Sequence, residues 1–212
     1  MSLIVFDLDG VIVDEYLPEL AKLVKKEKEV AEITLLGMKG KIDFKEGLKK
    51  RISLLKGLSI EVAKEVAMKM EYYDGVVETF KKLKEKKHTL AVITGCFDVF
   101  EERLKEDLGI DFVIANKFIV NNGHISDVDI IVDEHKEKHL EKLLDNIKID
   151  KEYVIMVGDG TNDIGIFKSA GYAVGLNPKD EIKPFINSEI KSIKEIVPIV
   201  NKLNNKNGEF DD

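Results

Sequence analysis

Two aspartates directly follow a short apolar run near the start of the chain. Residues 3–6 read Leu-Ile-Val-Phe, as in a buried strand, and Asp7, Leu8, Asp9 and Gly10 come next. Side chains alternate along a strand, so if the strand geometry continues, Asp7 and Asp9 point the same way while Leu8 faces the core. A carboxylate is already ionised at neutral pH, so Asp7 can act as a nucleophile without a base.

Three further groups of reactive residues follow in order: Thr94-Gly95 after an apolar run, then Lys136, then Gly158-Asp159-Gly160-Thr161-Asn162-Asp163. Glycine lets the backbone turn sharply in the last group, so Asp159 and Asp163 can face one ion. An anionic nucleophile that approaches an anionic phosphate is repelled unless cations neutralise both. Taken together, the groups indicate Mg²⁺-dependent phosphoryl transfer through an aspartate, with Lys136 as the second source of positive charge.

The remaining residue types fit the same chemistry. Mg²⁺ prefers oxygen ligands, and we expect Asp7 and Asp159 to bind it, with Asp163 either a direct ligand or a holder of the metal's water. Asp9 is then free to protonate the leaving alkoxide and later to act as base for the hydrolytic water. The Thr94 hydroxyl and the Gly95 amide would donate to non-bridging phosphate oxygens. Asn162 would reach either the same phosphoryl group or the substrate.

These groups and their order resemble the haloacid-dehalogenase-like phosphohydrolase superfamily, over most of the chain. Residues 43–55, 94–98 and 158–171 are most similar to its phosphoserine phosphatase branch. The resemblance implies a Mg²⁺-dependent phosphomonoester hydrolase that forms an aspartyl-phosphate and acts on a small metabolite, with O-phosphoserine the best single guess. It also implies that the Asp9 main-chain carbonyl binds the metal. Members that cleave carbon–halogen bonds or pump ions lack an acid at the position of Asp9.

The resemblance extends to substrate-binding residues. Lys136 lies 23 residues before Asp159, as in the resembled branch. Phe44 and Arg51 stand where that branch has an aromatic wall and an arginine for the substrate carboxylate, and a planar guanidinium binds carboxylate through two hydrogen bonds. Two positions depart from the branch. Tyr16 replaces the acid expected to receive the substrate amine, with Glu15 one residue away, and Cys96 replaces the second glycine of a pair.

Two other functions remain open from the sequence. A phosphotransferase or sugar-phosphate mutase of the same superfamily is the first, because residues 6–14 also resemble the mutase branch, although the Gly158–Asp163 loop favours the phosphatases. A phosphate-binding protein without catalysis is the second, and Asp9 argues against it because such a site needs no general acid.

The composition of the chain excludes some classes of binding partner. The net charge of -7 argues against nucleic acid, whose phosphates are bound by clustered Lys and Arg, and no apolar stretch is long enough to span a membrane. We expect a small phosphate ester as partner and a monomer or homodimer. The single cysteine, Cys96, and a first strand that begins without a charged-then-apolar leader predict a cytoplasmic protein.

Short apolar strands at 3–6, 89–93, 112–115, 153–157 and 172–174 alternate with helical periodicity at 76–86, 99–108, 136–146 and 163–169, the last capped by Thr161 or Asn162. This alternation predicts an α/β fold with a doubly wound parallel sheet, a Rossmann-like core. Ligands bind beyond the carboxyl ends of such strands. All the reactive groups fall there.

Residues 14–74 break the alternation and predict helices at 18–31, 44–55 with Asp43 as cap, and 59–70. We expect an inserted helical cap over 14–74, a catalytic core of 1–13 and 75–203 and a flexible tail of 204–212. Residues 118–125, with the turn Asn121-Asn122-Gly123, predict a β-hairpin attached to the core.

Overall fold

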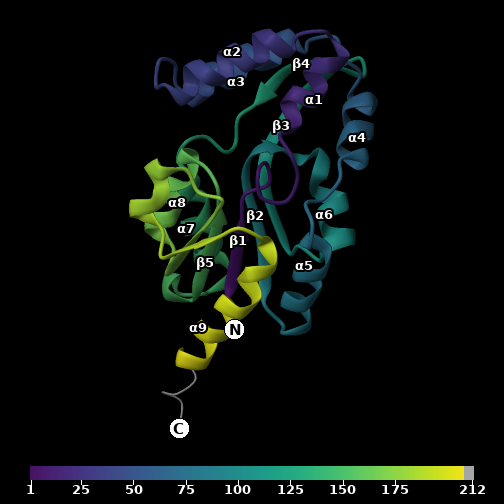
Figure 1. Cartoon of the computed structure of the whole chain (residues 1–212). Coiled ribbons are helices and arrows are strands. Elements are labelled where there is room, and N and C mark those ends of the chain that lie inside the picture. Colours follow the sequence, from purple (N-terminus) through teal and green to yellow (C-terminus); the bar gives the residue numbers. More distant parts are fainter. Residues whose placement is uncertain (208–212) are drawn as a thin grey trace.

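The strand that precedes Asp7 lies in the middle of the sheet. The computed structural model describes residues 1–207, and in them a seven-stranded sheet has the order β4-β3-β2-β1-β5-β6-β7 (Figure 1). All neighbours are parallel except β3 and β4. The strands are β1 (Leu3–Phe6), β2 (Thr89–Phe97), β3 (Phe112–Asn121), β4 (His124–Asp129), β5 (Val154–Gly158), β6 (Tyr172–Leu176) and β7 (Ser188–Ile190). The predicted α/β fold is confirmed.

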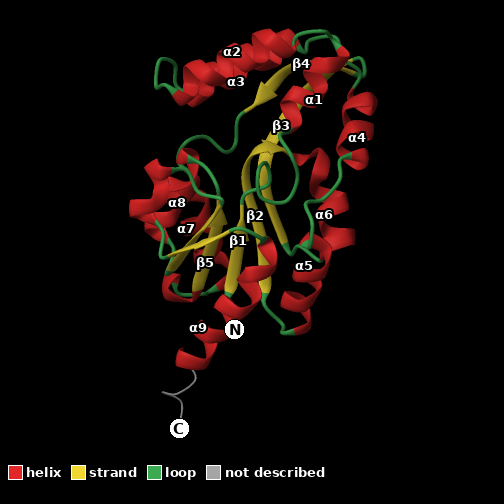
Figure 2. Cartoon of the chain, in the orientation of Figure 1, coloured by secondary structure: helices red, strands yellow, loops and turns green. Residues whose placement is uncertain are grey.

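Helices cover both faces of the sheet because its central strands are apolar on both sides (Figure 2). Ile4 and Phe6 of β1 pack in one buried cluster with residues of α5 (Val76–Glu85), α6 (Glu101–Leu108) and α9 (Ile196–Asn207). Leu3 and Val5 pack in the opposite cluster with residues of α7 (Lys136–Ile147) and α8 (Ile164–Ser169). Each such fully buried side chain contributes on the order of 1.5–3 kcal/mol, so β1 is a rigid support for Asp7.

Residues 14–74 form a layer of helices beyond the carboxyl ends of the strands (Figure 1). The helices are α1 (Tyr16–Leu23), α2 (Glu27–Met38), α3 (Phe44–Leu54) and α4 (Ile60–Lys69). The single helix predicted at 18–31 is wrong. Two helices stand in its place, because the helix is interrupted at Lys25, whose φ of 58° is left-handed. Asp43 caps α3 as predicted, because its carboxylate accepts from the Glu46 N–H at 2.7 Å. That this segment is a domain of its own stays a prediction.

The helical segment is joined to the sheet layer by two neighbouring linkers, the first near Val13 and the second near Tyr72. Val13 and Tyr72 form a β-bridge, and the Tyr73 N–H donates to the Ile12 carbonyl at 3.0 Å. Arg103 of α6 donates to the Met70 carbonyl at 2.5 Å, and its guanidinium lies 4.0 Å from the centre of the Tyr72 ring. The second linker is thereby fixed to the core.

The β3–β4 hairpin contacts the helical segment as well as the core. β3 is one continuous strand, and the Ile125 N–H of β4 donates to the Leu58 carbonyl at 2.8 Å. Its turn places Asn122 and Gly123 at positive φ, as an Asn-Gly hairpin requires.

The carboxyl-terminal part of the chain holds elements beyond the predicted ones. β7 and α9 had no predicted counterpart, and α9 extends to Asn207, so residues 204–207 are helical. Residues 208–212 of the expected tail lie outside the described part.

Candidate active site

The turn after β1 places Asp7 and Asp9 at the carboxyl edge of the sheet. The Leu8 carbonyl accepts from three following N–H groups, those of residues 11–13, and closes the turn. Gly10 has a φ of 79°, and a Cβ there would lie 2.5 Å from Oδ2 of Asp159. Only glycine allows this close approach of the Asp159 carboxylate to the turn.

Lys136 is buried beside two of the acids. Its Nζ donates to Oδ2 of Asp7 at 2.5 Å and to Oδ1 of Asp163 at 2.7 Å, and only 1% of the residue is exposed. Burial alone would lower the pKa of Lys136, but the Asp163 and Asp7 carboxylates raise it above its ordinary value. Lys136 is therefore a fixed positive charge at Asp7.

Three carboxylates converge at this edge. Ligand oxygens of Asp7, Asp159 and Asp163 all lie within 4.8 Å of one another. Burial and then repulsion by Asp7 and Asp163 raise the pKa of Asp159 to about 7. Burial also raises the pKa of Asp163, to about 6, although Lys136 opposes the rise. Lys136 forms ion pairs with Asp7 and Asp163, but no cationic side chain of residues 1–207 forms one with Asp159. The cluster carries an excess of negative charge.

Asp9 is in a different environment from Asp7, two residues before it. Burial, and next the negative charges of Asp7 and Glu15, raise the pKa of Asp9 to about 8. Its Oδ1 is buried without a hydrogen-bond partner. A carboxyl group that keeps its proton at neutral pH can serve as a general acid.

Thr94 and Gly95 lie in β2, next to β1. Thr94 is 1% exposed, and its Oγ1 accepts from the Cys96 N–H at 3.1 Å. Phe44 of α3 covers Gly95 so closely that a Cβ there would be 2.9 Å from the ring. The helical segment therefore touches residues 94–96, which carry the predicted hydrogen-bond donors to phosphate, at the predicted aromatic wall. We call residues 94–96 the phosphate-donor loop.

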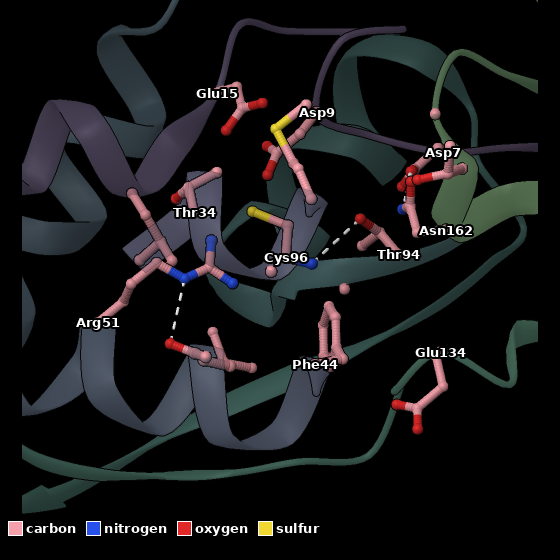
Figure 3. Close-up of a pocket in the computed structure, with 18 of the residues that line it drawn as sticks. Asp7, Asp9, Glu15, Thr34, Phe44, Arg51, Thr94, Cys96, Glu134 and Asn162 are labelled. Atoms are coloured by element: carbon pink, nitrogen blue, oxygen red, sulfur yellow. Dashed lines mark hydrogen bonds between the residues drawn. The ribbon is translucent and has the colours of Figure 1, made fainter. Parts of the chain in front are cut away.

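A cavity of about 390 Å³ connects these residues with the helical segment. Asp7 and Asn162 lie at one end of it, Glu15 and Arg51 at the other, and Thr94 and Cys96 between them (Figure 3). Asn162 Nδ2 donates to Oδ2 of Asp7 at 3.2 Å. Most of the sequence-predicted residues thus line one cavity. Lys136 and Asp163 do not line it but are buried next to Asp7, and Tyr16 lies elsewhere.

Tyr16, which was expected beside the substrate, is not in its expected place. It is fully buried outside the cavity, with its ring 4.9 Å from that of Phe100 and its hydroxyl donating to the Ala63 carbonyl at 2.7 Å. Glu15, one residue earlier, lines the cavity instead. The side chain of Tyr16 belongs to the core that α1 forms with α4 and the 3₁₀ turn before α6.

Arg51 is a half-buried cation at the far end of the cavity. Its Nε donates to the Gly47 carbonyl at 3.3 Å, which fixes the guanidinium against its own helix. Burial lowers the pKa of Arg51, and Glu15 is first among the charges that oppose this. Neither Arg51 nor Glu15 forms an ion pair within residues 1–207. Both charges are therefore available to a ligand.

The expected helix cap after β5 is wrong. Residues 161–163 form a turn of 3₁₀ helix before α8, and it is Oδ2 of Asp163 that accepts from the Asp159 and Gly160 N–H groups, at 3.2 and 3.4 Å. Neither Thr161 nor Asn162 caps the helix, because this 3₁₀ turn moves the start of α8 to Ile164 and its N-cap position to Asp163.

The cavity also contains residues that sequence reasoning missed. Among them are Thr34 and Met38 of α2, Glu134 before α7 and Lys179 after β6. Nothing in their local sequence marks them, because each is an ordinary surface residue in its own element. A further missed residue, Asn116, interrupts the apolar run of β3, and a buried amide of this kind was the one signal available.

Comparison with known proteins gives a consistent family. Residues 1–171 match the family model of the haloacid dehalogenase-like hydrolases. A phosphoserine phosphatase of Methanocaldococcus jannaschii is 36% identical over 94% of this chain and 97% of that protein. A phosphoserine phosphatase of Archaeoglobus fulgidus is also 36% identical, over 89% of this chain and 56% of that protein.

Solved structures agree. A phosphoserine phosphatase with an analogue of the phospho-aspartyl intermediate superimposes with a TM-score of 0.86 at 35% identity, covering 94% of this chain and 98% of that one. A substrate-bound phosphoserine phosphatase gives 0.87 at the same identity and coverage. In residues 1–207 no helix is long and apolar enough to cross a membrane.

Proposed function

The chain belongs to the haloacid dehalogenase-like hydrolases and is a phosphatase, and from its cavity we propose that it hydrolyses O-phosphoserine. The observation that carries this proposal is the placement of Arg51 and Glu15, two charges without an ion pair in residues 1–207, at the end of the cavity opposite Asp7. O-phosphoserine has a carboxylate and an ammonium group at the end opposite its phosphate. Arg51 would bind the carboxylate and Glu15 the ammonium, which places the phosphate at Asp7.

In the proposed reaction, Oδ1 or Oδ2 of Asp7 attacks phosphorus while the bond to the serine oxygen breaks. Asp9 gives its proton to that oxygen, so serine leaves as a neutral alcohol. Water then attacks the aspartyl-phosphate, Asp9 takes a proton from it, and Asp7 and inorganic phosphate are released. The raised pKa of Asp9 suits both steps. In the first, the group holds its proton at neutral pH until the alkoxide forms, and in the second, the carboxylate left behind is basic enough to take a proton from water.

Three donors hold the phosphoryl oxygens in this proposal. Thr94 and the Gly95 amide would lie on one side and Lys136 on the other, and the Thr94 and Lys136 side chains are buried where water does not compete with them. Asn162 assists by holding Oδ2 of Asp7.

The donor set fits Mg²⁺. Asp7, Asp159 and Asp163 would supply oxygens to a hard cation, and no ion pair in the described part of the chain occupies the Asp159 carboxylate. The Asp9 main-chain carbonyl, implied by the family resemblance, would be a further ligand. When bound, Mg²⁺ neutralises the charge between Asp7 and the phosphate.

Residues 14–74 are proposed to act as a cap that closes over the substrate, since α3 brings both Phe44 and Arg51 into the cavity. A cytoplasmic location and a monomeric or homodimeric state remain predictions.

The test is Mg²⁺-dependent phosphate release from a matched set of esters. Phosphoethanolamine lacks the carboxylate of O-phosphoserine, and 3-phosphonooxypropionate lacks the ammonium group. Arg51→Gln should raise KM for O-phosphoserine about 100-fold while leaving KM for phosphoethanolamine unchanged. Glu15→Gln should also raise KM for O-phosphoserine, while KM for 3-phosphonooxypropionate stays unchanged. A wild-type enzyme that prefers either truncated ester would overturn the substrate assignment. Rearrangement of a sugar phosphate without phosphate release would instead indicate a mutase.

A further inference from the structure

Asn116 of β3 connects two segments of the site through one buried amide. It is fully buried, and its Nδ2 donates to the Gly95 carbonyl at 2.8 Å. Its Oδ1 accepts from the N–H groups of Ile131 and Val132, both at 2.8 Å. Gly95 belongs to the phosphate-donor loop, and residues 131–132 lead into the segment that carries Lys136.

The sheet itself does not hold the donor loop at this point. The β2–β3 ladder pairs Ile93 with Ile114 and next pairs Phe97 with Asn116, so four residues of β2 span two residues of β3. Residues 94–96 therefore bulge out of the ladder, which lets Thr94 and Gly95 face the cavity but leaves the Gly95 carbonyl without a strand partner. The Asn116 side chain supplies the missing hydrogen bond.

This hydrogen bond also affects the Thr94 hydroxyl. The Gly95 carbonyl and the Cys96 N–H belong to the same rigid peptide unit, and that N–H donates to Oγ1 of Thr94 at 3.1 Å. Because Oγ1 accepts from this N–H, its own proton points elsewhere, and the open direction is the cavity. By fixing the peptide, Asn116 fixes Thr94 as a donor.

The helical segment docks onto both segments that Asn116 joins. Phe44 of α3 packs on Gly95, and its neighbour Lys45 forms an ion pair with Asp133 at 3.0 Å, directly after Val132. Both contacts need the two core segments to keep one spacing, and the amide of Asn116 sets that spacing.

We propose that Asn116 is a positioning residue of the phosphatase, which holds the Thr94–Gly95 donors and the segment leading to Lys136 in register. The inference rests on the proposed function, because the donors matter only if a phosphoryl group binds there. It assigns no contact between Asn116 and substrate; the effect passes through Thr94.

The test is a double-mutant cycle with Thr94→Ala, using whichever ester the wild-type enzyme hydrolyses fastest. Asn116→Asp keeps the acceptor and the shape but replaces the donor to Gly95, and it should lower kcat about 10- to 100-fold with KM changed less than about threefold. In the Thr94→Ala background the same substitution should lower kcat less than about threefold, because the residue through which it acts is gone.

A control for the same change of side chain outside the site is Asn187→Asp. Asn187 lies near the opposite end of the sheet, where its Oδ1 accepts from the Ala173 N–H at 2.7 Å, and its substitution should leave kcat unchanged. If Asn116→Asp does not fold, Asn116→Ser, which is too short to reach Gly95, takes its place in the cycle.

Equal losses in both Thr94 backgrounds would show a general structural role and overturn the proposal, as would a normal kcat in Asn116→Asp. A wild-type protein that releases phosphate from no ester would refute the proposed function itself, which is a distinct outcome.

Discussion

Replacing Asp159 by asparagine should make the metal-free protein more stable while it abolishes turnover. The Asp159 carboxylate is crowded by Asp7 and Asp163, and its pKa is raised from 3.8 to about 7. In the unfolded chain the group ionises near its ordinary pKa, so between these values the folded state holds a proton that the unfolded state has lost. Asp159 therefore does not lower the free energy of unfolding below about pH 4. It lowers this free energy progressively as the pH rises from about 4 through 7.

The magnitude follows from the size of this displacement. A pKa that moves from 3.8 to about 7 makes ionisation in the folded state less favourable by about 4 kcal/mol. The carboxylate is partly exposed, and solvent screening reduces this to about 2–4 kcal/mol. For a chain of this length such a change corresponds to about 4–16 °C in Tm.

Thermal unfolding followed by circular dichroism in the presence of EDTA measures the effect. Asp159→Asn should melt higher than the wild type at pH 8, with a smaller difference at pH 5, and Mg²⁺ should raise the Tm of the wild type only. Asp163→Asn is the matched control. It should not stabilise the protein, because Lys136 would lose one of its two partners.

A lower Tm for Asp159→Asn than for the wild type, in EDTA at pH 8, would refute this reasoning. It would mean that contacts of Asp159, rather than repulsion within the acidic cluster, dominate its contribution to the free energy of unfolding.

Three further substitutions test other parts of the structure. Lys136→Met should reduce phosphate release at least about 100-fold, and an enzyme that keeps normal kcat would exclude Lys136 from the phosphoryl site. Tyr16→Phe should lower the free energy of unfolding by about 1 kcal/mol without changing KM, measured by urea denaturation and steady-state kinetics; a raised KM would return Tyr16 to the substrate site. Arg103→Lys should speed hydrogen exchange in residues 67–72, because the hydrogen bond to the Met70 carbonyl and the stacking are lost, and unchanged exchange would contradict its role at the linker.

The arrangement of the site was predictable from the sequence because parallel strands share one carboxyl edge. Asp7, Thr94 and Asp159 are far apart along the chain, yet each follows or ends an apolar run, and β1, β2 and β5 are adjacent in the sheet. Lys136 was located by its spacing to Asp159, and its burial between two acids explains why no other nearby lysine could replace it.

The prediction failed where one residue of register decides the outcome. At the start of a helix, successive side chains point about 100° apart, so Glu15 enters the cavity while Tyr16 enters the core. A resemblance between sequence positions does not show in which direction each side chain points around the helix. Asn116 was missed for another reason: its importance depends on a bulge in the neighbouring strand, which is a property of strand pairing and not of local pattern.

The neighbouring linkers of the helical segment have a consequence for how such enzymes diversify. The chain leaves the sheet layer near Val13 and returns near Tyr72, and these two points already form a bridge. The intervening residues can therefore lengthen, shorten or be exchanged without pulling the core strands apart, since loop length alone adds little to the entropy of closure. The side chains proposed to select the substrate lie on this insert, and those proposed to cleave the ester lie on the core. Substrate preference can thus change independently, while the bond-breaking chemistry is inherited intact.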